Sequence, residues 1–360
     1  MSPVAHALQK RGIEPRLIFT GQHPGLDPDE FDLGTFPNDR LFIAGEANPH
    51  RHVARVARGL EPFFAASLDL VVVQGDTSSA LGGAFAASRA GIPVAHVEAG
   101  LRSHDLAAPW PEEGYRVRID RLSDLLFAPT ERAAAILSGE GKAGAVHVTG
   151  NSGIDAALAV ERSLPPAMLA DDESMRILVT CHRRESWGDG LESIAGAVRE
   201  IARIEGVTVD FVLHPNSHVA AAMRAALRGS SVRLLAPCSH RQLIERMRGA
   251  ALVLSDSGGI QEEAPALGVP LLVLRDKTER PEGVEFGNAI LVGTDGARIV
   301  AEVERLIADR AALARMSRRA YPYGDGRAGE RIAALIEEWL DERRLNSPPT
   351  STVPRMAEKW

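Results

Sequence analysis

Short, continuous apolar runs alternate with segments of helical periodicity along almost the whole chain. The runs are rich in β-branched residues, as is typical of parallel strands covered on both faces. Segments such as residues 77–91, with a Thr-Ser start, an Ala-rich apolar stripe and a final glycine, predict the helices between them. We therefore predict a series of βα units. The predicted strands lie within residues 16–22, 68–76, 93–100, 124–130, 145–151, 176–184, 209–215, 232–237, 251–259, 270–276 and 288–295.

A linker-like segment at residues 162–175 divides these units into two series. Two series favour an α/β fold of two doubly wound, Rossmann-like domains with a ligand in the cleft between them. We place the domains at residues 1–165 and 166–328. The amphipathic pattern at 329–345 predicts a helix that packs back on the first domain, and residues 346–360 have the composition of a tail.

The start of the chain departs from this pattern. A doubly wound domain normally opens with a strand, whereas here the first residues, MSPVAHALQKRG, already have helical periodicity. We therefore expect the first domain to lack its first strand.

The composition is that of an ordinary globular protein, with 360 residues of which 45% are apolar. Lys and Arg total 41 against 48 Asp and Glu, a net charge of -7, so nucleic acid is not a predicted partner. Cys181 and Cys238 have no paired spacing, so we predict neither a disulfide nor a metal site, which fits a reducing cytoplasm. No segment approaches the ~20 apolar residues needed to cross a bilayer, and no membrane partner is predicted.

Polar side chains follow several predicted strands at the point where each strand ends. In open α/β sheets ligands bind beyond the carboxyl ends of the strands, so these residues are candidates for a site. A single Asp in such a position is more often a helix cap, and Asp76, before Thr-Ser, can be read in that way. Several such ends facing one cleft favour a site. The candidates are Gln74, Asp76, Thr77, His96, Glu98, His182, Arg183, Arg184, Glu185, His214, Asp256 and Ser257.

The turn Ser257-Gly258-Gly259 precedes a predicted helix. Free N–H groups, the positive end of the helix dipole and the missing side chains suit a phosphate, although the same turn also serves as an ordinary helix start. Glu262 and Glu263 follow one turn later. They would repel inorganic phosphate, whereas a ribose hydroxyl can donate to a carboxylate, so the pattern favours a nucleotide.

The sequence has neither of the two glycine-rich nucleotide-binding motifs, G-x-G-x-x-G at the start of a helix or G-x-x-x-x-G-K-[ST]. Two other motifs carry charged residues at candidate positions. HRRES (182–186) supplies a histidine and two arginines that could neutralise a diphosphate, although surface arginines are often only solvated. PWPEE (109–113) places Glu112 and Glu113 behind two prolines. Carboxylates on a stiff loop suit proton transfer, and the alternative is an ordinary acidic first turn of a helix.

Together the motifs resemble one family, the non-hydrolysing UDP-N-acetylglucosamine 2-epimerases, over residues 1–343. The strings that carry the resemblance are GDT (75–77), HVEAGLRS (96–103), PWPEE (109–113), TGN (149–151), HRRES (182–186), SDSGGIQEEAPALG (255–268), RDKTERPE (275–282) and PYGDG (322–326). The resemblance implies the two-domain fold of GT-B type. It also implies a reaction without a cofactor, in which UDP is eliminated from UDP-GlcNAc and added back to give UDP-ManNAc through 2-acetamidoglucal.

The resemblance also implies roles for particular residues. Asp76, Glu98 and Glu112 would be the acid and base carboxylates, and His182 would assist the leaving diphosphate. The nucleotide and sugar would be bound by Arg183, His214, Ser257, Gly258, Gly259, Glu263 and Arg280. Members of the family are typically homodimers, so the resemblance implies a homodimer. Family members open with a strand and a G-T-R-P-E loop whose arginine contacts the nucleotide, and this chain starts after both.

Other activities remain compatible with the motifs. An epimerase for another UDP-sugar, or one that hydrolyses the glycal, would keep the same residues. A GT-B glycosyltransferase would share the fold and the nucleotide turn but would not need the three carboxylates together. An inactive UDP-sugar-binding protein is the alternative outside the enzymes.

Overall fold

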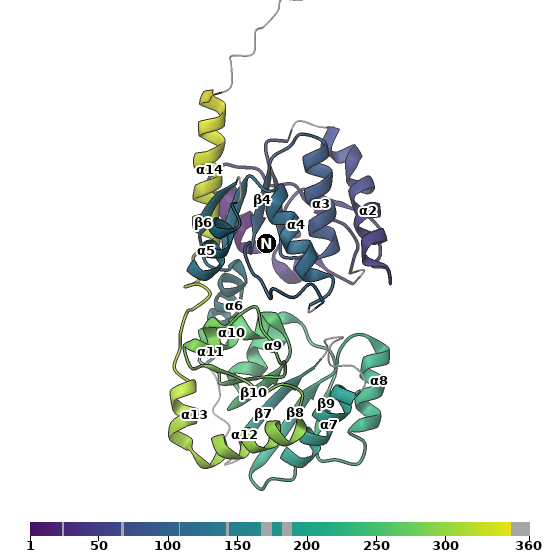
Figure 1. Cartoon of the computed structure of the whole chain (residues 1–360), viewed down its shortest axis with the longest axis vertical. Coiled ribbons are helices and arrows are strands. Elements are labelled where there is room, and N and C mark those ends of the chain that lie inside the picture. Colours follow the sequence, from purple (N-terminus) through teal and green to yellow (C-terminus); the bar gives the residue numbers. More distant parts are fainter. Residues whose placement is uncertain are drawn as a thin grey trace, which may run out of the picture.

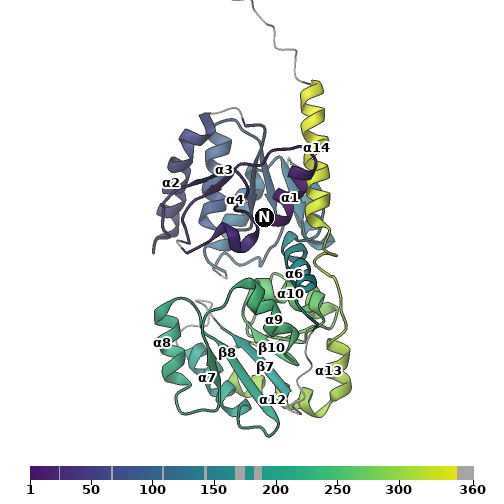
Figure 2. The same cartoon turned by 180° about the vertical axis from the view of Figure 1, so that it is seen from behind.

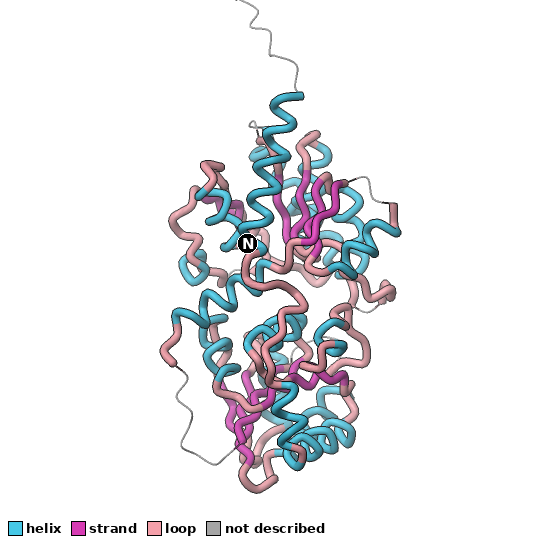
Figure 3. Tube along the Cα trace, turned by 90° about the vertical axis from the view of Figure 1, so that its left-hand side faces the viewer, coloured by secondary structure: helices cyan, strands magenta, loops and turns pink. Residues whose placement is uncertain are grey.

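The chain forms two main parallel sheets stacked along the long axis of the molecule, each with helices on both faces (Figures 1 and 3). The computed structural model describes residues 1–23, 25–65, 68–107, 109–141, 144–166, 175–181 and 189–346. Every predicted strand forms. β2 (Asn38–Arg40) was not predicted, because its three polar residues lack an apolar pattern.

The first sheet has the strand order β3-β4-β5-β6, and beside it β1 and β2 form a separate parallel pair. β4 and β5 are buried along their whole length, which explains their continuous apolar sequence. The bounds are β1 Leu17–Phe19, β3 Val71–Gln74, β4 Val94–Val97, β5 Leu125–Ala128 and β6 Ala145–Val148.

Two groups of helices cover the first sheet. α1 and α14 lie side by side on one face, where Val4 and Leu8 pack with Ile332 and Ile336 (Figure 2). α2, α3 and α4 cover the other face. Their bounds are α1 Ser2–Lys10, α2 Pro49–Leu60, α3 Ser78–Arg89, α4 Glu112–Leu122, α5 Glu131–Gly139 and α14 Ala328–Asn346, with 3-10 turns at η1 Pro28–Phe31 and η2 Glu61–Ala65.

The second sheet has six parallel strands in the order β12-β11-β10-β7-β8-β9. α7, α12 and α13 pack on one face, and α6, α9 and α10 pack on the other. The strands are β7 Met175–Thr180, β8 Val207–Val212, β9 Arg233–Leu235, β10 Leu252–Ser255, β11 Leu271–Val273 and β12 Ala289–Leu291. The helices are α6 Ser152–Ser163, α7 Asp189–Ile201, α8 Ser217–Ala226, α9 His240–Arg248, α10 Gly258–Leu267, α11 Glu282–Glu285, α12 Gly296–Ala308 and α13 Arg310–Met316.

The carboxyl ends of the two sheets meet. Glu98, directly after β4, contacts Arg280 of the second domain, and Asn151, after β6, contacts Glu262 on α10. None of the described helices is long and apolar enough to cross a membrane.

Candidate active site

Glu98 lies at a strained position directly after β4. Its φ is 72°, in the left-handed region that residues with a Cβ rarely adopt. Its Oε1 accepts a hydrogen bond of 2.9 Å from Nη2 of Arg280. Backbone strain at a polar strand end is common in functional sites, because the surrounding contacts must hold the residue there.

Arg280 binds three carboxylates, Glu98, Glu262 and Glu279, while only 8% of its side chain is exposed. Burial alone would lower the pKa of Arg280, but the three carboxylates raise it well above its usual value. Burial raises the pKa of Glu262 to about 8, although the charge of Arg280 opposes this shift. The second oxygen of Glu262 accepts from Asn151. The guanidinium of Arg280 is therefore fixed where the two sheets meet, and these carboxylates neutralise its charge.

Asp76 lies two residues after β3 and is held by Arg116 of α4. Nε of Arg116 donates to Oδ2 of Asp76 at 3.1 Å, and Nη2 donates to the same oxygen. The Arg116 side chain is 3% exposed, whereas that of Asp76 is 28% exposed. Asp76 is therefore a fixed carboxylate that still reaches solvent.

The two glutamates at the start of α4 differ in their surroundings. The Glu113 carboxylate is buried, accepts from the backbone N–H groups of Ser103 and His104 at 3.0 to 3.1 Å and also binds Arg116. Glu112 is half-buried at the first position of the helix. Glu113 therefore holds the loop that follows Glu98, and Glu112 is the better candidate for proton transfer.

The turn before α10 has the geometry of a helix start. Ser257 is the N-cap residue, α10 begins at Gly258, and within the described residues no amide of the helix donates to the Ser257 hydroxyl. Gly259 is exposed, and a Cβ added there would meet nothing nearer than Ser257 Oγ at 4.0 Å. The first N–H groups of α10 can therefore be reached by an anion.

Glu263, one turn into α10, accepts a hydrogen bond of 2.8 Å from Nε2 of His240, the first residue of α9. This hydrogen bond raises the pKa of His240. His214 follows β8 and is half-buried, and its Nδ1 accepts from the N–H of Asn216 at 3.1 Å. His214 thus follows a strand of the second sheet, and Glu263 lies on the helix that follows β10.

The His240–Glu263 pair predicts a pH-dependent contribution to stability. Because the folded protein raises the pKa of His240, the pair stabilises the fold fully below the unfolded pKa of about 6.5 and loses this effect as the pH rises through the folded pKa. We expect His240→Gln to lower the free energy of unfolding by about 1 kcal/mol at pH 6 and by almost nothing at pH 9. Urea unfolding at the two pH values measures this, and an equal loss at both would contradict it.

The chain is similar to known proteins over almost its whole length. A family model described as UDP-N-acetylglucosamine 2-epimerase matches residues 6–337. The UDP-N-acetylglucosamine 2-epimerase of Escherichia coli is 39% identical over 355 residues, which cover 94% of each chain. A probable UDP-N-acetylglucosamine 2-epimerase of Ralstonia nicotianae is 44% identical over 367 residues, with 94% of this chain and 96% of the relative covered.

Solved structures of UDP-N-acetylglucosamine 2-epimerases have the same fold as this chain. The crystal structure of UDP-GlcNAc 2-epimerase from Neisseria meningitidis, bound to UDP-GlcNAc, is 34% identical with a TM-score of 0.88 and covers 94% of this chain and 96% of that one. This chain belongs to the UDP-N-acetylglucosamine 2-epimerase family. The predicted family and the GT-B type fold of two Rossmann-like domains are thereby confirmed, and the family's enzymes are carbohydrate isomerases.

In this epimerase family member, the structure brings Glu98 and Arg280 into contact. Arg116 of α4 holds Asp76, and Glu112 is the first residue of the same helix. Ser257, Gly258 and Gly259 form the start of α10, and Glu263 follows on the same helix. His182 and Arg183 lie outside the described residues. The individual roles of these residues stay predictions.

Several residues of this candidate site were not predicted from the sequence. Arg116 lies in the middle of α4, where no strand end marks it, and His240 begins a helix far from the quoted motifs. His96 was noted but not assigned a role. It is fully buried, with Nδ1 2.6 Å from Asp120 and Nε2 2.9 Å from the Gly75 carbonyl, so it supports the loop before Asp76.

Proposed function

We propose that the chain inverts carbon 2 of UDP-N-acetylglucosamine to give UDP-N-acetylmannosamine without net hydrolysis. The observation that supports this best is the pair of carboxylates Asp76 and Glu98. Each follows a neighbouring strand of one sheet and is held by a buried arginine. Together with membership of the epimerase family, this pair favours a reaction that moves protons rather than one that only binds a nucleotide.

The proposed reaction is an elimination followed by an addition. A carboxylate removes the proton from carbon 2, the electrons of that bond form the carbon 1–carbon 2 double bond, and the bond from carbon 1 to the diphosphate oxygen breaks. The products of this half-reaction are UDP and 2-acetamidoglucal. In the second half-reaction UDP adds back to carbon 1 and a proton is delivered to the other face of carbon 2. Because the proton leaves one face of carbon 2 and is added to the other, the reaction needs a carboxylate on each side of the sugar ring. We assign these roles to Asp76, Glu98 and Glu112.

The leaving diphosphate needs positive charge and N–H donors. The start of α10 offers reachable backbone N–H groups. Arg280, held by carboxylates at the junction of the sheets, is assigned to substrate binding. Glu263 would accept from the ribose hydroxyls, in the orientation that His240 gives it. His182, Arg183 and His214 complete the proposal as groups that bind or protonate the diphosphate.

The deciding experiment is proton NMR of the protein with UDP-GlcNAc in deuterated water. We expect deuterium at carbon 2 of both UDP-sugars and little free UDP, because the eliminated nucleotide is added back. Accumulating free N-acetylmannosamine would identify a hydrolysing enzyme instead. Binding of UDP-GlcNAc without exchange would identify a binding protein or a glycosyltransferase, and the proposal would then be wrong.

The role of the α10 start predicts the effect of a single methyl group. Gly259→Ala fits the folded protein, because the nearest atom to the added Cβ is Ser257 Oγ at 4.0 Å. We expect the methyl group to hinder an anion that approaches the first N–H groups of the helix. We expect it to weaken UDP binding at least ~10-fold, measured by calorimetry, because one or more charge-assisted hydrogen bonds of about 1.5–3 kcal/mol are lost or lengthened.

A matched control separates this effect from helix stability. Gly196 lies within α7, and a Cβ there also meets nothing within 4 Å. Both Gly→Ala changes should stabilise their helices slightly, by up to about 1 kcal/mol, because alanine has the higher helix propensity. Only Gly259→Ala should weaken UDP binding, and equal affinity in the two variants would contradict a nucleotide at this turn.

A further inference from the structure

α4 carries a row of three ionisable side chains on its buried face. Glu113, Arg116 and Asp120 are 2%, 3% and 1% exposed, and their spacings of three and four residues place them on one side of the helix. Burying charged groups costs free energy unless each is paired, so such a row does more than fill space. Glu113 binds the loop that follows Glu98, and Arg116 binds Asp76. Asp120 is the third member of this row.

The carboxylate of Asp120 joins β4 to the loop that follows it. Its Oδ1 lies 2.6 Å from Nδ1 of His96 on β4, and its Oδ2 accepts from Nη2 of Arg102 at 2.7 Å. Arg102 also donates from Nε to Glu140, directly after α5, at 2.8 Å. The side chains of His96 and Asp120 are fully buried. Asp120 therefore fixes the orientation of the His96 ring.

The other nitrogen of this ring contacts the Gly75 carbonyl, which lies where the pairing of β3 with β4 ends. In a continuing parallel ladder the N–H of Ala99 would donate to the Gly75 carbonyl. The chain turns at Glu98, whose φ is 72°, and the N–H of Ala99 donates instead to Phe127 of β5 at 3.1 Å. Nε2 of His96 lies 2.9 Å from the Gly75 carbonyl and takes the place of the ladder donor.

The Gly75 carbonyl determines where the hydrogens of the His96 ring lie. A carbonyl oxygen can only accept, so Nε2 must carry a hydrogen. The hydrogen between Nδ1 and Asp120 can lie on either atom, and both arrangements leave the Nε2–H donor in place. The neutral ring with its hydrogen on Nδ1 alone is excluded, because a bare Nε2 would face the lone pairs of the carbonyl at 2.9 Å.

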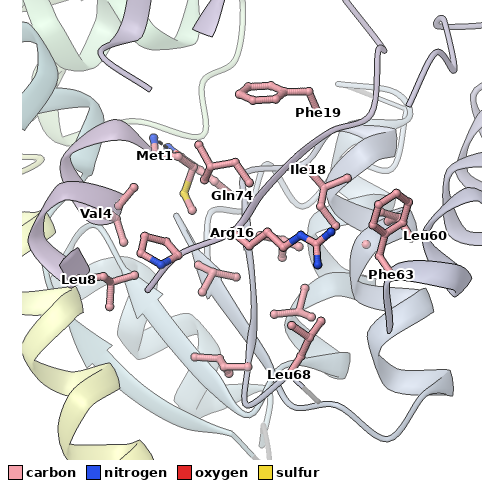
Figure 4. Close-up of a pocket in the computed structure, with 18 of the residues that line it drawn as sticks. Met1, Val4, Leu8, Arg16, Ile18, Phe19, Leu60, Phe63, Leu68 and Gln74 are labelled. Carbon is pink, nitrogen blue, oxygen red and sulfur yellow. Dashed lines mark hydrogen bonds between the residues drawn. The ribbon is translucent and has the colours of Figure 1, made fainter. Parts of the chain in front are cut away.

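Gly75 lies beside both carboxylates that the proposed reaction uses. β3 ends at Gln74, which lies close to Met1 (Figure 4), and Gly75 and Asp76 follow. A Cβ added to Gly75 would lie 3.8 Å from Oε2 of Glu98. Gly75 also has a positive φ, of 67°, so the chain turns on both sides of this contact. A rotation of the Gly75 peptide would therefore move Asp76 relative to Glu98.

We propose that His96 is a positioning residue for the proposed reaction, acting through the bond from its Nε2–H to the Gly75 carbonyl while Asp120 fixes the ring. This bond replaces the ladder bond that the turn at Glu98 removes, and it holds Asp76 and Glu98 at a constant separation. The inference rests on the proposed function, because the separation matters for proton transfer at carbon 2. A misplacement of about 1 Å can lower a rate about 10²-fold.

Two substitutions separate the two contacts of the ring. The amide nitrogen of glutamine can take the place of Nε2, whereas that of asparagine, on a shorter side chain, takes the place of Nδ1. His96→Gln therefore keeps the donor to Gly75, and His96→Asn keeps only the contact with Asp120. We expect His96→Asn to lower kcat and deuterium incorporation at carbon 2 about 100-fold, and His96→Gln to lower both no more than ~10-fold. The Kd for UDP should stay within ~3-fold in both variants.

A matched control shows whether this difference reports packing. His52 is also a buried histidine of the first domain, and its Nε2 lies 3.0 Å from the Ile43 carbonyl. His52→Asn and His52→Gln should lower Tm, as the changes at His96 should, because each removes a buried ring. Their kcat values should differ less than ~2-fold from each other. A tenfold difference between them would mean that the difference at His96 reports packing, and the proposal would be wrong.

NMR without substrate tests the hydrogen bond itself. The unmodified chain labelled with ¹⁵N-histidine should show Nε2 of His96 as an N–H group. Carbonyl-¹³C glycine with ¹⁵N-aspartate selects the three Gly-Asp pairs of the sequence, of which Gly75-Asp76 is one. Its carbonyl signal should shift in His96→Asn and stay near its position in His96→Gln.

The outcomes separate this role from the proposed function. A bare Nε2 in the unmodified chain would overturn the positioning role, and so would equal losses of kcat in His96→Asn and His96→Gln. Both results leave the epimerase activity of the unmodified chain intact. An unmodified chain that does not turn over UDP-GlcNAc would instead overturn the proposed function, and the positioning role with it.

Discussion

Glu98→Gln is expected to lower kcat by about 10³-fold, the middle of the range for loss of a general acid or base. Glutamine has the size of glutamate and keeps an oxygen that can accept from Arg280, so the contact between the sheets survives. What it loses is the ability to take or give a proton. The exchange of the carbon 2 proton for deuterium should fall by the same factor, while UDP binding stays within ~2-fold because the nucleotide does not need this proton transfer.

The control for this change is Glu302→Gln, which removes a carboxylate that pairs with Arg305 on the surface of α12. Its activity should equal that of the unmodified chain. If Glu98→Gln keeps more than a tenth of the activity, Glu98 is not the acid or base, and its strained backbone serves another purpose.

Arg280→Met is expected to lower the free energy of unfolding by about 3–5 kcal/mol, measured by urea denaturation without ligand. The side chain of Arg280 binds Glu98, Glu262 and Glu279, and those of Glu262 and Glu279 are no more than 5% exposed. Methionine keeps much of the volume but leaves these carboxylates without the charge that compensates their burial. Removing one member of a buried ion network costs far more than removing a surface pair.

Two further variants test the cause of this loss. Arg305→Met removes a surface arginine whose partner is Glu302, and it should cost no more than about 0.5 kcal/mol. Adding Glu262→Gln to Arg280→Met should change the stability little further at pH 7, because the pKa of Glu262 is about 8 even beside the charge of Arg280 and its carboxyl group is neutral without it. Equal losses in the two arginine variants would mean that the network contributes nothing beyond a surface pair.

The strands were predictable because buried parallel strands leave a continuous apolar signal. β10 and β11, buried at every position, are read directly from LVLS and LLV. β2 was missed because Asn38, Asp39 and Arg40 carry no such signal and the pairing with β1 alone decides their conformation. The sequence also does not predict that β1 and β3 each have a strand neighbour on one edge only, because this depends on the distances between segments far apart in the chain.

The candidate site was predictable where its residues follow strands. Asp76, Glu98 and Ser257 fall at strand ends, and topology brings such ends together. Arg116 was not predictable, because an arginine in the middle of a helix is usually solvated and only the packing of α4 buries it. The difference between Glu112 and Glu113 likewise needs the positions of the Ser103 and His104 N–H groups.

The chain passes between the two sheets twice, and the two passages lie side by side. It leaves the first sheet through α6 and returns to α14 past Tyr323, whose carbonyl accepts from the N–H of Asn151 at the start of α6 at 2.7 Å. Because the two domains are joined at two neighbouring points, one can rotate about the line through these points but cannot slide or twist freely against the other. Relative motion of the domains should therefore follow a single hinge axis on the side of α6 and α13, and the gap should widen most on the opposite side, between α2 and α8 (Figure 1).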